Sequence, residues 1–465
     1  MHHIVVNHKG RKFMEHAKST DHGSFLWRFS KKFNFAADKL IPESFVFALI
    51  LTAIVFVLAF FLTDSGPMKI VNAWYGGLWS MISFAFQMTI MVVLTSMAAK
   101  SPQLEKILSS IASTPKSAAS AYVILIIFAT VASWINWAFG TILSPVLAMY
   151  LSKNIKKVHF PLMIAAGYAC MIMVQPICPS ISAVALLASP DHFMVDQVGV
   201  MPVSETAFNP LGLIMVAILF VVTLMVAIKT TPPEDEVVSF DGEINLQVEG
   251  KDEANETFAD KMNNSRLVLG VFSLIGIVYF IYHFMTGNGL TLNFIIFIFL
   301  IADLILYKTP KKFVDAVKHN MVLAANVMIQ FPFYGGIMGV MAKTGLTGVL
   351  ANGLIFLASE HTIYWFSYVS ASIVNLFVPS QGGQWIVQGP ILVEAAQAFD
   401  AHMPSIVTAF MMGDEATNLI QPLYIIPALA LVDIELKKVW GFMAFIWFIW
   451  FITSTIGLIL LPMIL

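Results

Sequence analysis

One carboxylate stands inside a long apolar stretch in the last quarter of the chain. Asp414 follows Gly413 and lies one helical turn before Asn418, with Glu415 and Thr417 between them. An ionisable side chain within a membrane span is costly and by default marks a functional site whose partner should be named. We expect Asp414 to face a small coupling cation, a proton or sodium. The alternative is structural, because Asp is also a common cap of broken helices. Glu415 is expected to point to a different face.

Two Gln-Pro steps interrupt apolar segments, at Gln175-Pro176 and Gln421-Pro422. Proline removes a backbone donor and breaks a helix, so both segments are predicted to be discontinuous helices. Helices of this kind carry ion and substrate sites near the middle of the membrane in secondary transporters. A bound sodium is conceivable here, although its ligands are not specified. The candidates for the coupling-ion site are Asp414, Thr417, Asn418, Gln421 and Gln175.

Two stretches rich in glycine and proline are poor candidates for ordinary spanning helices, one near 136–145 and one near 375–390. Both begin with Asn, and both are predicted to form re-entrant hairpins, which a membrane tolerates only where protein or a water-filled cavity satisfies the backbone. The simpler alternative is a packing kink. Hairpin tips expose unpaired amides that can bind an anion. The candidate substrate ligands are Asn136, Gly140, Thr141, Asn375, Ser380, Gln381, Gly382, Gly383 and Gln384.

Neither broken region contains Arg or Lys. A bound carboxylate would therefore rely on amides and hydroxyls rather than on guanidinium clamps, which are the strong partners of carboxylates. This favours a small monoanion over a di- or tricarboxylate.

The surrounding composition is that of a membrane protein. Of the 465 residues, 58% are hydrophobic and 12% are charged, against about a quarter charged in soluble domains. An all-α polytopic fold is predicted, with about ten to twelve passes at roughly 20 residues per span. The clearest spans are Ser44–Thr63, Trp74–Ala98, Leu211–Ala227, Leu267–Phe284, Thr291–Tyr307 and Phe442–Leu465.

Three segments recur in the same order and at nearly constant separation. Met81–Met91 is echoed by Met328–Met338, and Ala132–Asn136 by Ala371–Asn375. The third match pairs the glycine and Gln-Pro step around 167–176 with those around 413–422. Two related halves with breaks at matching points are the signature of a secondary transporter.

Basic residues alternate between equivalent loops of the two halves, as inverted topology requires under the positive-inside rule. The expected organisation is a basic, cytoplasmic N-terminal segment (1–43), a first transmembrane half (44–229), an acidic cytoplasmic linker (230–265) and a second half (266–465). The N-terminal segment holds eight Lys or Arg, and the linker holds ten of the 28 acidic residues. We interpret the linker as solvated, because it has few apolar residues.

The motif from Val378 to Pro390, together with Gly413-Asp414 and the run from Thr417 to Pro422, resembles the short-chain fatty acid transporter family. The run from Ile329 to Tyr334 is similar to that family as well. The resemblance covers nearly the whole chain. It implies uptake of acetoacetate, butyrate or similar monocarboxylates across a bacterial inner membrane. It also implies membership of the ion transporter superfamily, with an elevator-type scaffold, a mobile transport domain carrying two hairpins, and scaffold-mediated homodimers.

Two positions depart from the family pattern. The family usually has Gly where this chain has Gln381, and Gln-Trp where it has Glu415-Ala416, so the acid carried and the coupling ion stay open. The leading hypothesis is a cation-coupled monocarboxylate symporter that works by alternating access, with no cofactor beyond H⁺ or Na⁺ and no nucleic-acid partner. The alternatives are a membrane-embedded hydrolase that uses Asp414 and an anion channel.

Overall fold

The computed structural model describes residues 44–80, 82–99, 101–135, 137–179, 181–188, 194–242, 257–287, 292–376, 381–421 and 424–464. Every regular element within these ranges is a helix, as the sequence predicted. The basic segment 1–43 lies outside the described residues.

The helices of the first half begin with α2 and end with α12, and a short helix η2 follows them. They are α2 (Ser44–Leu62), α3 (Pro67–Ser80), α4 (Ile82–Ala99), α5 (Pro102–Ala112), α6 (Ala118–Ile135), α7 (Trp137–Asn154), α8 (Phe160–Val174), η1 (Gln175–Ile177), α9 (Ser182–Leu187), α10 (Val195–Val198), α11 (Val203–Thr206), α12 (Pro210–Lys229) and η2 (Glu234–Glu236).

The helices of the second half run from α13 to the C-terminus. They are α13 (Phe258–Asn263), α14 (Arg266–Met285), α15 (Leu292–Tyr307), α16 (Pro310–Asn320), η3 (Met321–Ala324), α17 (Ala325–Thr344), α18 (Leu346–Ile355), α19 (Ile363–Asn375), α20 (Gln381–Ala398), α21 (Met403–Asn418), α22 (Ile426–Leu431), α23 (Leu436–Leu460) and η4 (Leu461–Met463).

Polar caps start several of the apolar helices. Asn209 caps α12, and its side chain accepts a hydrogen bond from the Leu211 amide, with proline at the first helical position. Thr309 caps α16 in the same way, again ahead of proline. Caps of this kind satisfy amides that a helix leaves unpaired, and proline at the first position loses nothing there.

Six helical runs are long and apolar enough to cross a membrane: Pro67–Ala98, Ala118–Ile135, Phe160–Ile177, Pro210–Lys229, Phe258–Met285 and Leu436–Met463. Two shorter apolar helices lie at Ala48–Leu62 and Ile296–Tyr307. Each of the clearest spans expected from sequence contains or overlaps one of these runs, so the chain is a polytopic membrane protein.

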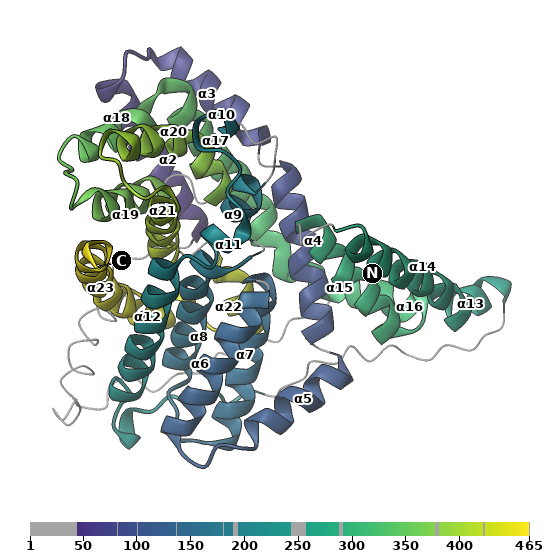
Figure 1. Ribbon diagram of the computed structural model, residues 1–465. Helices are drawn as coiled ribbons and strands as arrows, with labels where there is room; N and C mark the ends of the chain where they lie inside the picture. Colours follow the sequence, from purple (N-terminus) through teal and green to yellow (C-terminus); the bar gives the residue numbers. More distant parts are fainter. Residues whose placement is uncertain are drawn as a thin grey trace.

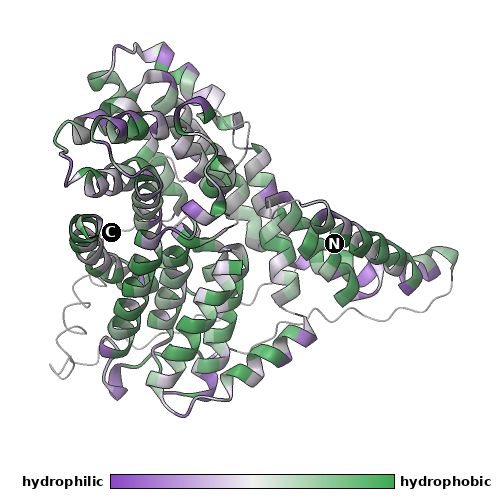
Figure 2. Cartoon of the chain, viewed as in Figure 1, coloured by the Kyte–Doolittle hydropathy of each residue, from purple (hydrophilic) through white to green (hydrophobic). Residues whose placement is uncertain are grey.

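The helices form a body and an arm (Figure 1). In the body, α6, α7, α8, α12 and α23 share one large apolar core. A second core joins α2, α3 and α17. The arm consists of α13 to α16 and projects from the body, which it meets where α15 and α16 pack on α4. Figure 2 shows hydrophobic residues along most of the arm as well as through the body.

The contact between α3 and α17 depends on glycine. A β-carbon on Gly77 would lie 2.3 Å from the Gly335 carbonyl oxygen, and one on Gly339 would lie 2.4 Å from the Ala73 carbonyl oxygen. Small residues let membrane helices approach until their backbones touch. This seam therefore joins a helix of the first half to a helix of the second through main-chain contact.

The segment 231–242 belongs to the acidic linker that we predicted to be solvated, and only Pro232 in it is buried. It is hydrogen-bonded to the α7–α8 connection: the Val238 amide donates to His159 Nδ1 (3.1 Å), and the Phe240 amide donates to Ser152 Oγ (2.9 Å). The Phe160 amide in turn donates to the Val238 carbonyl (2.8 Å). We call residues 231–242 the latch. Linker residues 243–256 lie outside the described residues.

Candidate functional site

Helix α19 lies between α20 and α21, and polar residues gather where the three helices meet. The approach of α21 is very close at Gly413, where a β-carbon would sit 2.1 Å from the Tyr368 carbonyl oxygen. Ser372 Oγ donates across this contact to the Gly413 carbonyl (3.0 Å). Glycine at position 413 therefore brings the polar residues that follow it against the last turns of α19.

Asn375 is the centre of this arrangement. Its Nδ2 lies 2.6 Å from the Asp414 carbonyl oxygen, 2.9 Å from Thr417 Oγ1 and 2.8 Å from Asn418 Oδ1. Thr417 Oγ1 donates onward to the Ser372 carbonyl (2.9 Å). The sequence placed Asn375 with the substrate and the other three residues with the ion. The structure brings all four into one hydrogen-bonded group.

Asp414 is fully buried inside α21. Neither of its carboxylate oxygens has a hydrogen-bond partner among the described residues, and the same is true of Asn375 Oδ1. The capping alternative is wrong for this residue, because His402 is the N-cap of α21 and Ile425 that of α22. Burying a carboxylate in its charged form without a partner is costly, which sets Asp414 apart from the hydrogen-bonded polar groups around it.

The partial charges at the ends of α20 and α21 also act on this group of residues. Asp414 lies in the last turns of α21, where the helix carries a partial negative charge that favours cations. Helix α20 begins at Gln381, with Gly382 and Gly383 in its first turn. The amides of a first turn lack partners inside the helix and favour anions. A cation-favouring end and an anion-favouring end therefore flank the C-terminal part of α19.

Three glutamines of α20 form hydrogen bonds with neighbouring helices. Gln384 Nε2 donates to the Ala371 carbonyl of α19 and to Gln388 Oε1, both at 2.9 Å. Gln388 Nε2 continues the chain to Ser370 Oγ (2.9 Å). Gln381 Oε1 accepts from the Ala183 amide (3.2 Å). Gln384 Oε1 and Gln381 Nε2 have no partner among the described residues, which leaves one acceptor and one donor for a ligand.

In the first half, α6 and α7 pack against each other, but the break between them lies earlier in the chain than we expected. Helix α7 begins at Trp137, so Gly140, Thr141 and Pro145 lie inside it rather than in a hairpin tip. A β-carbon on Gly140 would clash with Ser133 of α6, so this glycine sets the distance between the helices. Thr141 Oγ1 donates to the Trp137 carbonyl (2.8 Å).

Two predicted ligands, Asn136 and Ser380, lie outside the described residues. The first half also contributes Tyr168, whose hydroxyl donates to the Asn418 carbonyl (2.8 Å) and links α8 to the end of α21. Gln175 donates to the Met171 carbonyl (3.0 Å), while the side chain of Gln421 has no partner among the described residues. Both glutamines are almost fully buried at the ends of their helices.

Glu415 contacts both the Asp414 group and a cavity beside it. It lines a separate cavity of about 20 Å³ between α8, α12, α21 and α23, together with Tyr368 and Ser454. Asn418 Nδ2 donates to Glu415 Oε2 (3.2 Å). Asn418 therefore connects Glu415 to Asn375, since its Oδ1 accepts from Asn375 Nδ2 on the other side.

Sequence reasoning missed Ser370, Ser372, Gln388 and Tyr168. The signal for the two serines was present, because polar residues recur along the otherwise apolar helix that ends at Asn375. Tyr168 follows Gly167 as Asp414 follows Gly413 in the matched segments, but its hydroxyl reaches the site because α8 packs against α21.

Comparison with known proteins places this architecture among transporters. The family profile described as "Short chain fatty acid transporter" matches residues 25–461. A Haemophilus influenzae protein is 30% identical over 416 residues, which cover 87% of this chain and 93% of that protein. An Escherichia coli protein is 28% identical over 437 residues, which cover 93% of this chain and 98% of its own length. Both carry the name "Putative short-chain fatty acid transporter".

Among solved structures, the crystal structure of the Alcanivorax borkumensis YdaH transporter aligns with 89% of this chain and 98% of its own. The TM-score is 0.42 and the sequence identity is 13%.

Proposed function

The chain belongs to the short-chain fatty acid transporter family, and on that premise we propose that it carries short-chain monocarboxylates, such as butyrate or acetoacetate, together with a coupling cation. The observation that supports coupling is the buried carboxylate of Asp414, whose oxygens have no partner among the described residues. A proton or a sodium ion would remove the cost of that charge. Asn375, Thr417 and Asn418 lie beside it and offer amide and hydroxyl oxygens.

The carboxylate of the substrate would bind at the start of α20. The first-turn amides of Gln381, Gly382 and Gly383 and the free Nε2 of Gln381 are donors that suit an anion without a basic side chain. Gln384 would position this turn, because its own Nε2 bonds to α19 and to Gln388. Ser380 directly precedes them, and Asn136 and Thr141 are the candidates from the first half. A monoanion beside a monovalent cation makes a neutral cargo, which lowers the cost of moving both through the membrane.

The proposed movement is alternating access by an elevator of two inverted repeats. Helices α6 to α8 and α19 to α23, with α12, would form the transport domain. The seam of α2, α3 and α17, with α4 and the arm, would form the scaffold. The large core of α6, α7, α8, α12, α21 and α23 and the core of α2, α3 and α17 support that division, and Val374 of α19 lies where the second core meets the proposed transport domain. A bacterial inner-membrane location and a homodimer through the scaffold complete the proposal.

Uptake by proteoliposomes tests the function. Labelled butyrate or acetoacetate would be offered to vesicles containing the purified protein, with a sodium gradient or a proton gradient imposed separately. We expect accumulation above the outside concentration under one of the two gradients. Absence of accumulation under either would reject symport. Equilibration without accumulation would favour a channel, and chemical conversion of the labelled acid would favour a hydrolase.

A further inference from the structure

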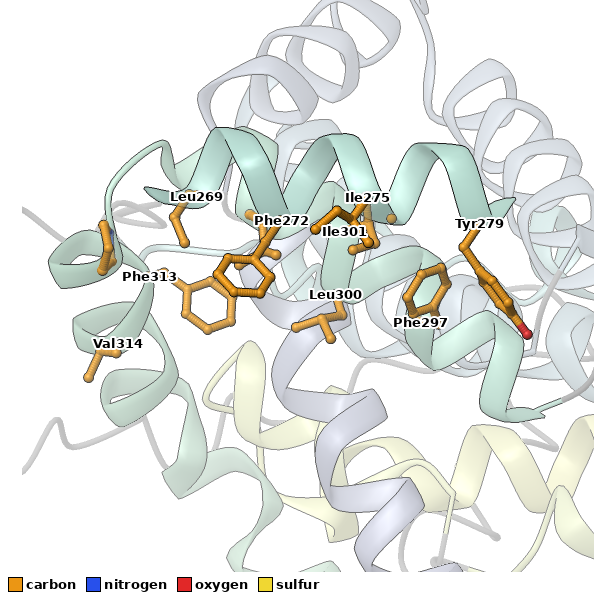
Figure 3. A pocket seen from close by; sticks show the side chains of 12 residues that line it. Leu269, Phe272, Ile275, Tyr279, Phe297, Leu300, Ile301, Phe313 and Val314 are labelled. Atoms are coloured by element: carbon orange, nitrogen blue, oxygen red, sulfur yellow. The ribbon is translucent and has the colours of Figure 1, made fainter. Parts of the chain in front are cut away.

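The arm carries an apolar groove that the transport proposal does not use. It lies between α14, α15 and α16 and has a volume of about 600 Å³ (Figure 3). Leu269 and Phe272 of α14, Phe297 of α15 and Phe313 of α16 converge on it from three helices. Phe272 is 59% exposed. The groove is therefore open to the bilayer along the helix that contributes most of it.

A polar cleft of about 250 Å³ continues the groove at the α16 end. The two share Pro310 and Val314 in their linings, so the two spaces lie next to each other at the start of α16. The cleft is lined by Asn263, Asn264, Asp260, Lys311, Asp315 and Lys318. A long apolar space that opens onto a small charged one has the chemistry of a phospholipid, with its chains in the first and its headgroup in the second.

Helix α16 fits an interfacial position between these two spaces. Lys311, Asp315 and Lys318 recur at helical spacing on its polar side, while Phe313 and Val314 face the groove. Amphipathic helices with lysine on the polar face lie in the headgroup region of a membrane. The charged cleft is then at headgroup depth and the groove at the depth of the acyl chains.

The charges in the cleft select the headgroup. Its lining holds two lysines and two aspartates, so its formal charge is balanced. Lys318 Nζ lies 3.8 Å from Asp315 Oδ1, and Lys311 interacts electrostatically with Asp260. An anionic headgroup would satisfy the lysines but be repelled by the carboxylates. A zwitterionic headgroup with a primary ammonium offers phosphate oxygens to the lysines and N–H donors to the aspartates.

We propose that this arm binds one glycerophospholipid of the phosphatidylethanolamine type. The acyl chains fill the groove between α14, α15 and α16, the phosphate accepts from Lys311 and Lys318, and the ammonium donates to Asp260 and Asp315. Phosphatidylcholine, which lacks N–H donors, and anionic phosphatidylglycerol should both bind less well.

Native mass spectrometry of the purified full-length protein tests this proposal, with each of the three lipids added separately at equal concentration. We expect a one-to-one complex with phosphatidylethanolamine, favoured about tenfold over the other two, because only its headgroup offers hydrogen-bond partners to both the lysines and the aspartates. Equal binding of all three lipids, or preference for phosphatidylglycerol, would overturn the headgroup assignment. A protein dimer that excludes every lipid would assign the groove to a second copy instead.

Two pairs of variants localise the site. Lys311→Gln combined with Lys318→Gln should abolish the preference, whereas Lys312→Gln, on the same helix outside the cleft lining, should keep it. Val314→Trp should block the point where groove and cleft meet, at a residue that is 45% exposed and so tolerant of size. Val278→Trp, exposed on α14 outside the groove lining, is its control. A loss in the controls as large as in the test variants would reject the site.

Discussion

At the scale of a single residue, a substitution of Asp414 tests whether its carboxylate couples uptake to a cation. In one-to-one symport of a monoanion and a monovalent cation, a tenfold cation gradient supports about tenfold accumulation, or about 1.4 kcal/mol. We expect Asp414→Asn to reduce accumulation to equal concentrations on the two sides, because the neutral amide needs no cation. Gradient-driven uptake of labelled butyrate measures this. Asp196→Asn, at an exposed position of α10, is the control and should transport normally. Unchanged accumulation in Asp414→Asn would exclude the residue from coupling.

Removal of the Asn375 side chain should lower the stability of the folded protein. Asn375→Ala removes an NH₂ group whose two hydrogens face three acceptors, the Asp414 carbonyl, Thr417 Oγ1 and Asn418 Oδ1, so up to two of them lose a donor. The cost of buried unpaired acceptors should lower the free energy of unfolding by about 1–3 kcal/mol. Thermal unfolding in detergent measures the change as a lower midpoint. Ser367→Ala is the matched control, since this buried hydroxyl of the same helix has no partner among the described residues. A midpoint as high as that of the control would contradict the network.

At the scale of elements, Gly413 sets the distance between α19 and α21. Gly413→Ala would place its β-carbon against the Tyr368 carbonyl, and backbone cannot move aside as a side chain can. Overpacking of this kind costs about 1–3 kcal/mol, so we expect a lower unfolding midpoint and impaired uptake. Gly348→Ala should be neutral or slightly stabilising, because its β-carbon would meet only Ile391 Cδ1, at 3.7 Å. If Gly413→Ala kept wild-type uptake and stability, α19 and α21 would not need the close contact that Gly413 allows.

The elements that the sequence predicted well are those set by local rules. Apolar length identified the spans, and the Gln-Pro steps identified where α8 and α21 end. The position of the break before α7 was predicted too late in the chain, because Pro145 was expected to break the helix. Membrane helices tolerate proline where Ser and Thr side chains bond nearby carbonyls, and Ser144 Oγ bonds the Gly140 carbonyl beside Pro145. Which side chains meet across helices, such as Tyr168 and Asn418, depends on packing that no local pattern encodes.

At the scale of the whole molecule, the latch makes stability depend on pH. Burial lowers the pKa of His159, which precedes the Phe160–Ile177 run, from 6.5 to about 3. The ring of His159 accepts a hydrogen bond from the Val238 amide and lies beside Phe442. The backbone amide of His159 donates to the Tyr122 hydroxyl. Between pH 6.5 and 3 the unfolded chain binds a proton at His159 that the folded protein does not. The free energy of unfolding should therefore fall as the pH falls through this window.

Thermal unfolding in detergent at a series of pH values from 7.5 to 4.5 checks this dependence, with a slope of up to about 1.4 kcal/mol per pH unit from this residue. His159→Asn can keep an acceptor for the Val238 amide but has no titrating group, so the slope should flatten. His361→Asn, at an exposed position, should leave the slope as in the wild type. Equal slopes in wild type and His159→Asn would show that the latch residue does not titrate as proposed.

The latch also bears on how the chain is made. Four of its residues are bonded to earlier parts of the chain: Glu234, Val238, Ser239 and Phe240 bond to residues that lie 77 to 88 positions before them. During synthesis, the contact can close as soon as residue 242 has emerged, before any helix of the second half exists. The first half would then have its latch bonded to α7 and to the start of α8 while the rest of the chain is still being synthesised. The later helices α21 and α23, which pack on α8 and α12, would then assemble against a template rather than against a loose chain.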